Sequence, residues 1–97
     1  MNTANLQLEG LCLAIAAINR ELVAKGLLSR ADIETALRRA ETGANSDHRS
    51  GHLSPANRDA VCFPIRLLQL ANANSGEPLS FADLAKKVGE TKYGDAR

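Results

Sequence analysis

The sequence is poor in the residues that favour β-strands. It contains no tryptophan, one tyrosine and two phenylalanines among its 97 residues, and leucine and alanine supply most of its apolar side chains. Leucine and alanine favour helices, whereas aromatic and β-branched residues favour strands. The composition therefore predicts an all-α fold.

Cysteine is also scarce, and its two occurrences predict no disulfide framework. Cys12 and Cys62 both lie in apolar stretches with helical spacing. We interpret them as small buried side chains, because apolar surroundings make a thiol unreactive. No glycine-rich phosphate loop, pair of catalytic carboxylates or nucleophile elbow is present, so we expect neither an enzyme nor a cofactor.

The chain lacks both a surplus of one charge and a long hydrophobic run. Twelve basic and eleven acidic residues give a net charge of +1, too little to attract a phosphate backbone or an anionic membrane. The longest apolar run is LCLAIAAI, residues 11–18, whereas a transmembrane helix needs about 20 apolar residues. The first ten residues resemble no export signal, so we expect a cytoplasmic protein without membrane attachment.

The apolar residues recur with helical spacing in four stretches of what we predict to be one domain, residues 1–97. Helices are expected over residues 3–25, 29–42, 55–72 and 80–88, with a loop over 43–54 and a frayed tail over 89–97. The short joint KGLLS favours an antiparallel hairpin of the first two helices. The predicted fold is a compact four-helix bundle with a long N-terminal helical hairpin and a short fourth helix.

A proline lies inside the third predicted helix. Pro64 lacks a backbone donor and its ring clashes with the preceding turn. Because apolar residues continue on both sides of it, we predict one helix kinked at Pro64. The alternative is two short helices, the second of which begins at Pro64.

One six-residue pattern occurs twice, as LSRADI over residues 28–33 and LSFADL over 79–84. The similarity ends within about one helical turn, which is the reach of an N-terminal cap. A serine followed three residues later by an aspartate is typical of a helix start. We therefore interpret the two segments as helix starts capped by Ser29 and Ser80, not as a duplicated unit.

The first predicted helix carries the candidate interaction surface. Spacings of three and four residues place five aliphatic side chains on one stripe: Leu8, Leu11, Ile15, Ile18 and Leu22. Residues 11–18 are apolar on all sides, so this helix is either the centre of the bundle or part of a subunit interface. We expect a small interaction or regulatory module whose partner is a second copy or another protein.

The segment SFADLAKKVGETK, residues 80–92, suggests an alternative function in nucleic-acid binding. It resembles the first half of a helix-turn-helix, with Gly89 four residues after Ala85. Only eight residues follow Gly89, which is too short for a recognition helix. We therefore consider nucleic acid the less favoured partner.

A third hypothesis is a metal site or a small enzyme at residues 47–52. His48 and His52 are four residues apart, beside Asp47. On a helix this spacing would place both imidazoles on one face. In a loop that contains glycine and serine the spacing fixes no geometry, so we expect solvated histidines and no bound metal.

Four runs of the sequence together resemble a group of short, uncharacterised bacterial helical proteins. The runs are MNTANLQLEG, VAKGLLSRADIETALRRAE, LSPANRDAVCFPIRLLQLAN and SFADLAKKVGETK. The resemblance covers nearly the whole chain and implies an all-helical fold. It implies no activity, ligand or site residue.

Overall fold

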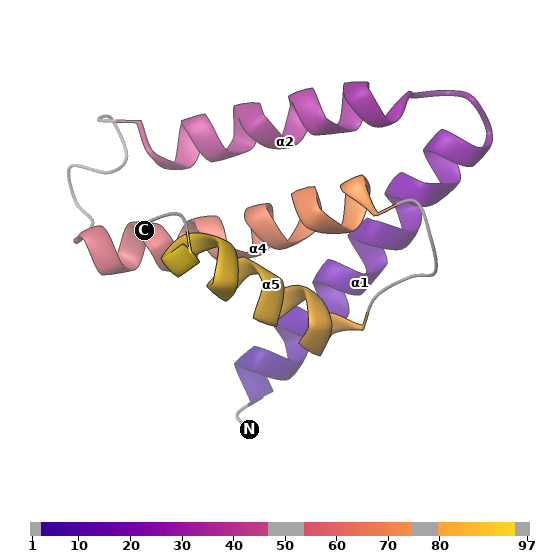
Figure 1. The fold of residues 1–97 in the computed structure, drawn as a ribbon. Coiled ribbons are helices and arrows are strands. Elements are labelled where there is room, and N and C mark those ends of the chain that lie inside the picture. Colours follow the sequence, from indigo (N-terminus) through magenta and orange to yellow (C-terminus); the bar gives the residue numbers. More distant parts are fainter. Residues whose placement is uncertain (1–2, 47–53, 75–79, 95–97) are drawn as a thin grey trace.

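The computed structural model describes residues 3–46, 54–74 and 80–94, which fold into helices without any strand (Figure 1). The helices are α1 (Thr3–Ala24), α2 (Arg30–Ala44), α4 (Pro55–Ala73) and α5 (Phe81–Gly94). This arrangement confirms the predicted all-α fold of four helices. Within the described residues, no helix is both long enough and apolar enough to cross a bilayer.

The helix α4 lies at the centre and packs on α1, α2 and α5 (Figure 1). Its Leu67 is 1% exposed and joins the core cluster with Cys12 of α1 and with Leu84 and Val88 of α5. A central position for α1, which was one of the two alternatives raised by its apolar sequence, is therefore excluded.

The two arms of the N-terminal hairpin pack mainly on α4 and not on each other. Gly26 has a φ of +74°, the left-handed conformation that ends a helix, and the backbone N–H of Leu27 donates to the carbonyl of Leu22 at 3.0 Å. On the N-terminal side of this turn, α1 runs diagonally away from α2 (Figure 1). The short connection therefore reverses the chain between α1 and α2, but both helices bury their apolar sides mainly against α4.

A polar cluster accompanies the apolar contact between α2 and α4. Ile33 of α2 is 4% exposed. Further along α2, the carboxylate of Glu41 accepts hydrogen bonds from Arg66 Nε at 2.9 Å and from Gln69 Nε2 at 3.1 Å. The seam is thus held by buried aliphatic surface and by a charged pair.

Serine side chains cap the starts of α2, α4 and α5. Ser29 Oγ accepts from the backbone N–H of Asp32 at 3.0 Å, and Asp32 Oδ2 accepts from the backbone N–H of Ser29 at 2.9 Å. Ser54 and Ser80 each accept from the backbone N–H three residues on, at 3.1 Å. These bonds confirm that LSRADI and LSFADL are helix starts.

Replacing a capping serine is expected to destabilise the protein measurably. Ser29→Ala and Ser80→Ala each remove one acceptor and should lower the free energy of unfolding by about 1 kcal/mol. Ser29→Asp keeps an acceptor and should change it much less. Urea unfolding measures all three variants, and equal stabilities of Ser29→Ala and Ser29→Asp would contradict the role of the cap.

The structure differs from the predicted helix boundaries at the end of the chain. The helix α4 passes through Pro64 as one helix, which excludes the alternative of two. The helix α5 continues through Gly89 to Gly94 instead of ending near residue 88. Leu84 and Val88 are 3% and 6% exposed, and this burial holds α5 on the core up to the point where a glycine suggested its end.

Candidate interaction surface and adjoining cavities

Exposed large apolar side chains concentrate on α1 and the turn that follows it. They are Leu6, Leu11, Leu13, Ile18, Leu27 and Leu28, and among the described residues only Val61 of α4 adds to them. Single exposed apolar side chains are ordinary on protein surfaces, whereas several of them on one helix make that helix the candidate interaction surface.

The predicted stripe on α1 divides between the core and the surface. Leu8 packs against the core cluster, and Ile15 and Leu22 are half-buried. Leu11 and Ile18 remain 60% and 58% exposed. They are seven residues apart, so they lie two turns from each other on the same flank of the helix.

This side of α1 is free of charge over a long stretch. No charged residue occurs between Gly10 and Asn19, and the small side chain of Ala14 is exposed next to Ile15. We name the side formed by Leu11, Ala14, Ile15 and Ile18 the dry flank. Another helix could approach the dry flank closely without burying a charge.

A largely apolar cavity of about 190 Å³ opens on the other flank of α1. Its lining includes Cys12, Leu13 and Ala17 of α1, Leu67 of α4 and Leu84 of α5. Burial raises the pKa of the Cys12 thiol, so this group is neutral and unreactive at neutral pH. Cys12 and Cys62 are both free and buried, as predicted from the sequence.

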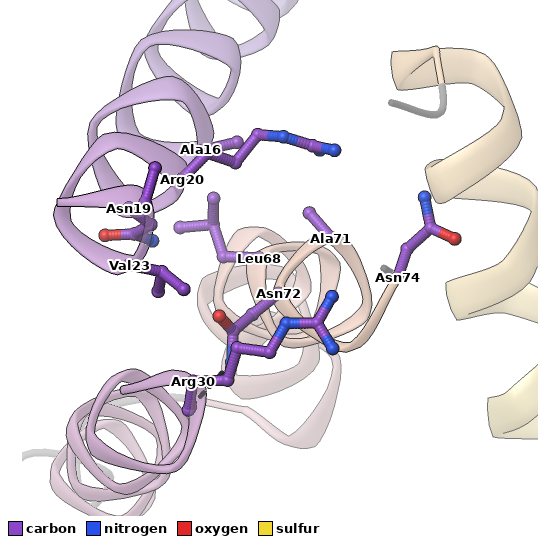
Figure 2. Close-up of a pocket in the computed structure, with 10 residues that line it drawn as sticks. Ala16, Asn19, Arg20, Val23, Arg30, Leu68, Ala71, Asn72 and Asn74 are labelled. Carbon is purple, nitrogen blue, oxygen red and sulfur yellow. Dashed lines mark hydrogen bonds between the residues drawn. The ribbon is translucent and has the colours of Figure 1, made fainter. Parts of the chain in front are cut away.

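A second cavity, of about 180 Å³, adjoins the first, and half of the residues that line it are polar (Figure 2). Five polar residues line it: Asn19, Arg20, Arg30, Asn72 and Asn74. The side chain of Asn72 donates to the backbone carbonyl of Arg30 at 3.0 Å. Figure 2 shows the side chains of Arg20 and Arg30 extending towards the side of the cavity where Asn74 lies.

The two cavities share three lining residues, Ala16, Arg20 and Ala71. Among the residues that the structure describes, neither lining includes an aspartate or a glutamate. The seam between α1 and α4 therefore passes from a mostly apolar cavity to one that Arg30 and three asparagines also line. Sequence analysis missed this site, because only the packing of α1 on α4 brings Arg20 near Asn72.

The segment that resembles a helix-turn-helix does not form the turn. The helix α5 continues through Gly89, where that motif requires its first helix to end. Leu84 and Val88 face the core, whereas Lys86 and Lys87 are exposed. The residues of the helix-turn-helix resemblance thus form part of one packed helix.

The predicted histidine loop, with Asp47, His48 and His52, lies outside the described residues. Within the part of the chain that the structure describes, no three His, Cys, Asp or Glu side chains gather in a geometry that could hold a metal ion.

No family model, curated protein or solved structure matches this chain. The functional interpretation therefore rests on the geometry of α1 and its neighbours.

Proposed function

We propose that the protein is a small cytoplasmic interaction module without catalytic activity of its own, and that it self-associates through the dry flank of α1. The observation that supports this most is the exposure of Leu11 and Ile18, 60% and 58%, on an uncharged stretch of helix. Because α4 occupies the centre of the bundle, packing within one chain leaves these side chains uncovered.

An antiparallel contact between two α1 helices fits this flank best. A two-fold axis makes both copies use the same surface. If the axis passes between Ala14 and Ile15, Leu11 of each copy meets Ile18 of the other. The helix dipoles then oppose each other, which is favourable.

A parallel contact is less favourable because it aligns like charges. Lys25 lies seven residues beyond Ile18, on the same flank. Parallel helices would set Lys25 against Lys25 of the second copy, whereas the antiparallel contact sets it near Ala4. Like charges that face each other repel.

The mass of the protein in solution tests the proposal. We expect a dimer in sedimentation equilibrium, and we expect Leu11→Glu to give a monomer, since each dimer would bury two carboxylates among apolar side chains. Val61→Glu introduces the same charge at an exposed apolar position on α4 and should leave the mass unchanged. A wild-type protein that stays monomeric at all accessible concentrations would contradict the proposal.

A mixing experiment tests the direction of the helices. Leu11→Glu protein and Ile18→Lys protein should each be monomeric alone. In an equal mixture, an antiparallel dimer of one copy of each variant sets the new glutamate at position 11 against the new lysine at position 18. Its second contact joins the unchanged Ile18 to the unchanged Leu11, so the dimer should return. A parallel contact pairs neither charge, and a mixture that stays monomeric would exclude the antiparallel arrangement.

A further inference from the structure

The largely apolar cavity of about 190 Å³ beside α1 is a candidate binding site in its own right. We propose that it binds one compact, uncharged apolar molecule of the size of a benzene ring. The site lies wholly within this cavity and does not involve the second one. None of the residues of the dry flank lines it, so the proposed site is also separate from the proposed self-association.

The cavity extends from the surface of α1 to the hydrophobic core. Its lining includes three core residues, Cys12, Leu67 and Leu84, which are 2%, 1% and 3% exposed. It also includes Leu13 and Ala17, which are exposed. A small molecule can therefore enter past Leu13 and Ala17 and reach buried apolar surface without any separation of the helices.

The size of the cavity follows from the packing of the helices and suits a single ring. The helices α1 and α5 both pack on α4 but touch each other little. Ala16 and Ala17 of α1 and Ala71 of α4 line the resulting gap, and their small side chains leave it open. An apolar protein cavity of about 150 Å³ admits benzene, whereas pockets for larger ligands begin at roughly 300 Å³. The space therefore favours one compact molecule over a long chain.

The chemistry of the lining favours an apolar molecule over water or an ion. Among the described residues that line the cavity, only Arg20 has a charged side chain, and the thiol of Cys12 is the other polar group. Arg20 already takes part in another interaction, and the ligand needs no contact with its guanidinium. A buried water needs about two to four polar partners, and an ion would lose its hydration among apolar side chains. An aromatic ring can also contact the polarizable sulfur of Cys12.

Titration with benzene and with pyrazine, followed by the methyl resonances of the protein, tests the site. Pyrazine has the shape of benzene but carries a nitrogen at each end of the ring, so one nitrogen must lie among apolar atoms without a partner. Benzene should shift the methyl resonances of Leu13, Leu67 and Leu84 saturably and bind at least about tenfold more tightly than pyrazine. Equal affinities, or no saturable shift up to the solubility limit of benzene, would overturn the proposal. Largest shifts at Leu11 and Ile18 would also overturn it, since they would place benzene on the dry flank.

Substitutions that fill the cavity locate the binding site on the chain. Ala17→Trp, at an exposed position of the lining, and Cys12→Met, at its buried end, should each weaken benzene binding at least about tenfold. Ala82→Trp introduces the same ring at an exposed position of α5 that lines neither cavity, and it should leave the affinity unchanged. Unchanged benzene affinity in Ala17→Trp protein that keeps the melting temperature of the unliganded wild type would overturn the proposal, whether or not Cys12→Met folds.

The same titration at two protein concentrations separates a small molecule from a second copy of the chain as the occupant. A side chain of a second copy would compete with benzene and would do so more strongly as the protein concentration rises. We expect the affinity for benzene to be the same at both concentrations, because the dry flank and the cavity share no residue. An affinity that falls as the protein concentration rises would assign the cavity to the second copy and overturn the proposal.

Discussion

Replacing Leu67 by alanine is expected to lower the free energy of unfolding by about 2–5 kcal/mol. Leu67 is 1% exposed and lies in the core cluster where α4 meets α1 and α5. The substitution removes methyl groups from contact with both neighbouring helices and leaves a void. Since the free energy of unfolding of a domain is about 5–15 kcal/mol in total, this one substitution should remove a large fraction of it.

Urea unfolding at fixed protein concentration measures the effect of Leu67→Ala. The matched control is Leu6→Ala, because Leu6 is 53% exposed and its truncation should change the free energy of unfolding by about 0.5 kcal/mol or less. Similar losses in the two variants would contradict the central position of α4.

The starts of the helices were predictable because the responsible signals are local. Ser29, Ser54 and Ser80 each accept a hydrogen bond from a backbone amide three residues away, and Gly26 adopts its left-handed conformation within one turn of the end of α1. Such contacts depend on a few neighbouring residues, so the sequence pattern is sufficient to place them.

The centre of the fold was not predictable in the same way. The most apolar stretch is in α1, yet the central helix is α4, because its sides complement α1, α2 and α5 together. Gly89 suggested a helix end, but α5 continues to Gly94, and the buried Leu84 and Val88 hold its first part on the core. These outcomes depend on how distant helices fit together, which local patterns do not encode.

The candidate site shows the same division between local and distant contacts. The stripe on α1 was visible from its spacing, but its separation into a half-buried side with Leu8 and an exposed side with Leu11 depends on where α4 packs. The cavities depend on three helices at once, since Arg20 and Arg30 come from α1 and α2 and Asn72 comes from α4. A surface can thus be proposed from one helix, whereas a cavity requires the assembled fold.

Acid is expected to weaken the seam between α2 and α4 through Glu41. Burial disfavours the charged form of this carboxyl, but the hydrogen bonds from Arg66 and Gln69 and the positive charge of Arg66 outweigh burial and lower the pKa of Glu41. A carboxyl whose pKa is lower in the folded chain binds its proton more readily in the unfolded chain. Its contribution to stability is therefore present above the unfolded pKa of about 4.3 and is lost as pH falls through the folded value.

Glu41→Gln should lower the free energy of unfolding at pH 7 by about 1–3 kcal/mol, because the partly buried charge of Arg66 would lose its hydrogen-bonded carboxylate and keep only the longer contact with Asp59, at 3.8 Å. Below about pH 4 the loss should shrink, since the wild-type carboxyl also becomes neutral there. Glu34→Gln is the matched control: Glu34 pairs with Arg38 at 2.8 Å, but the Arg38 side chain is 74% exposed, so about 0.3–0.5 kcal/mol is expected. Urea unfolding across this pH range compares the variants, and a Glu41→Gln loss that stays constant with pH would show that the ion pair does not stabilise the seam.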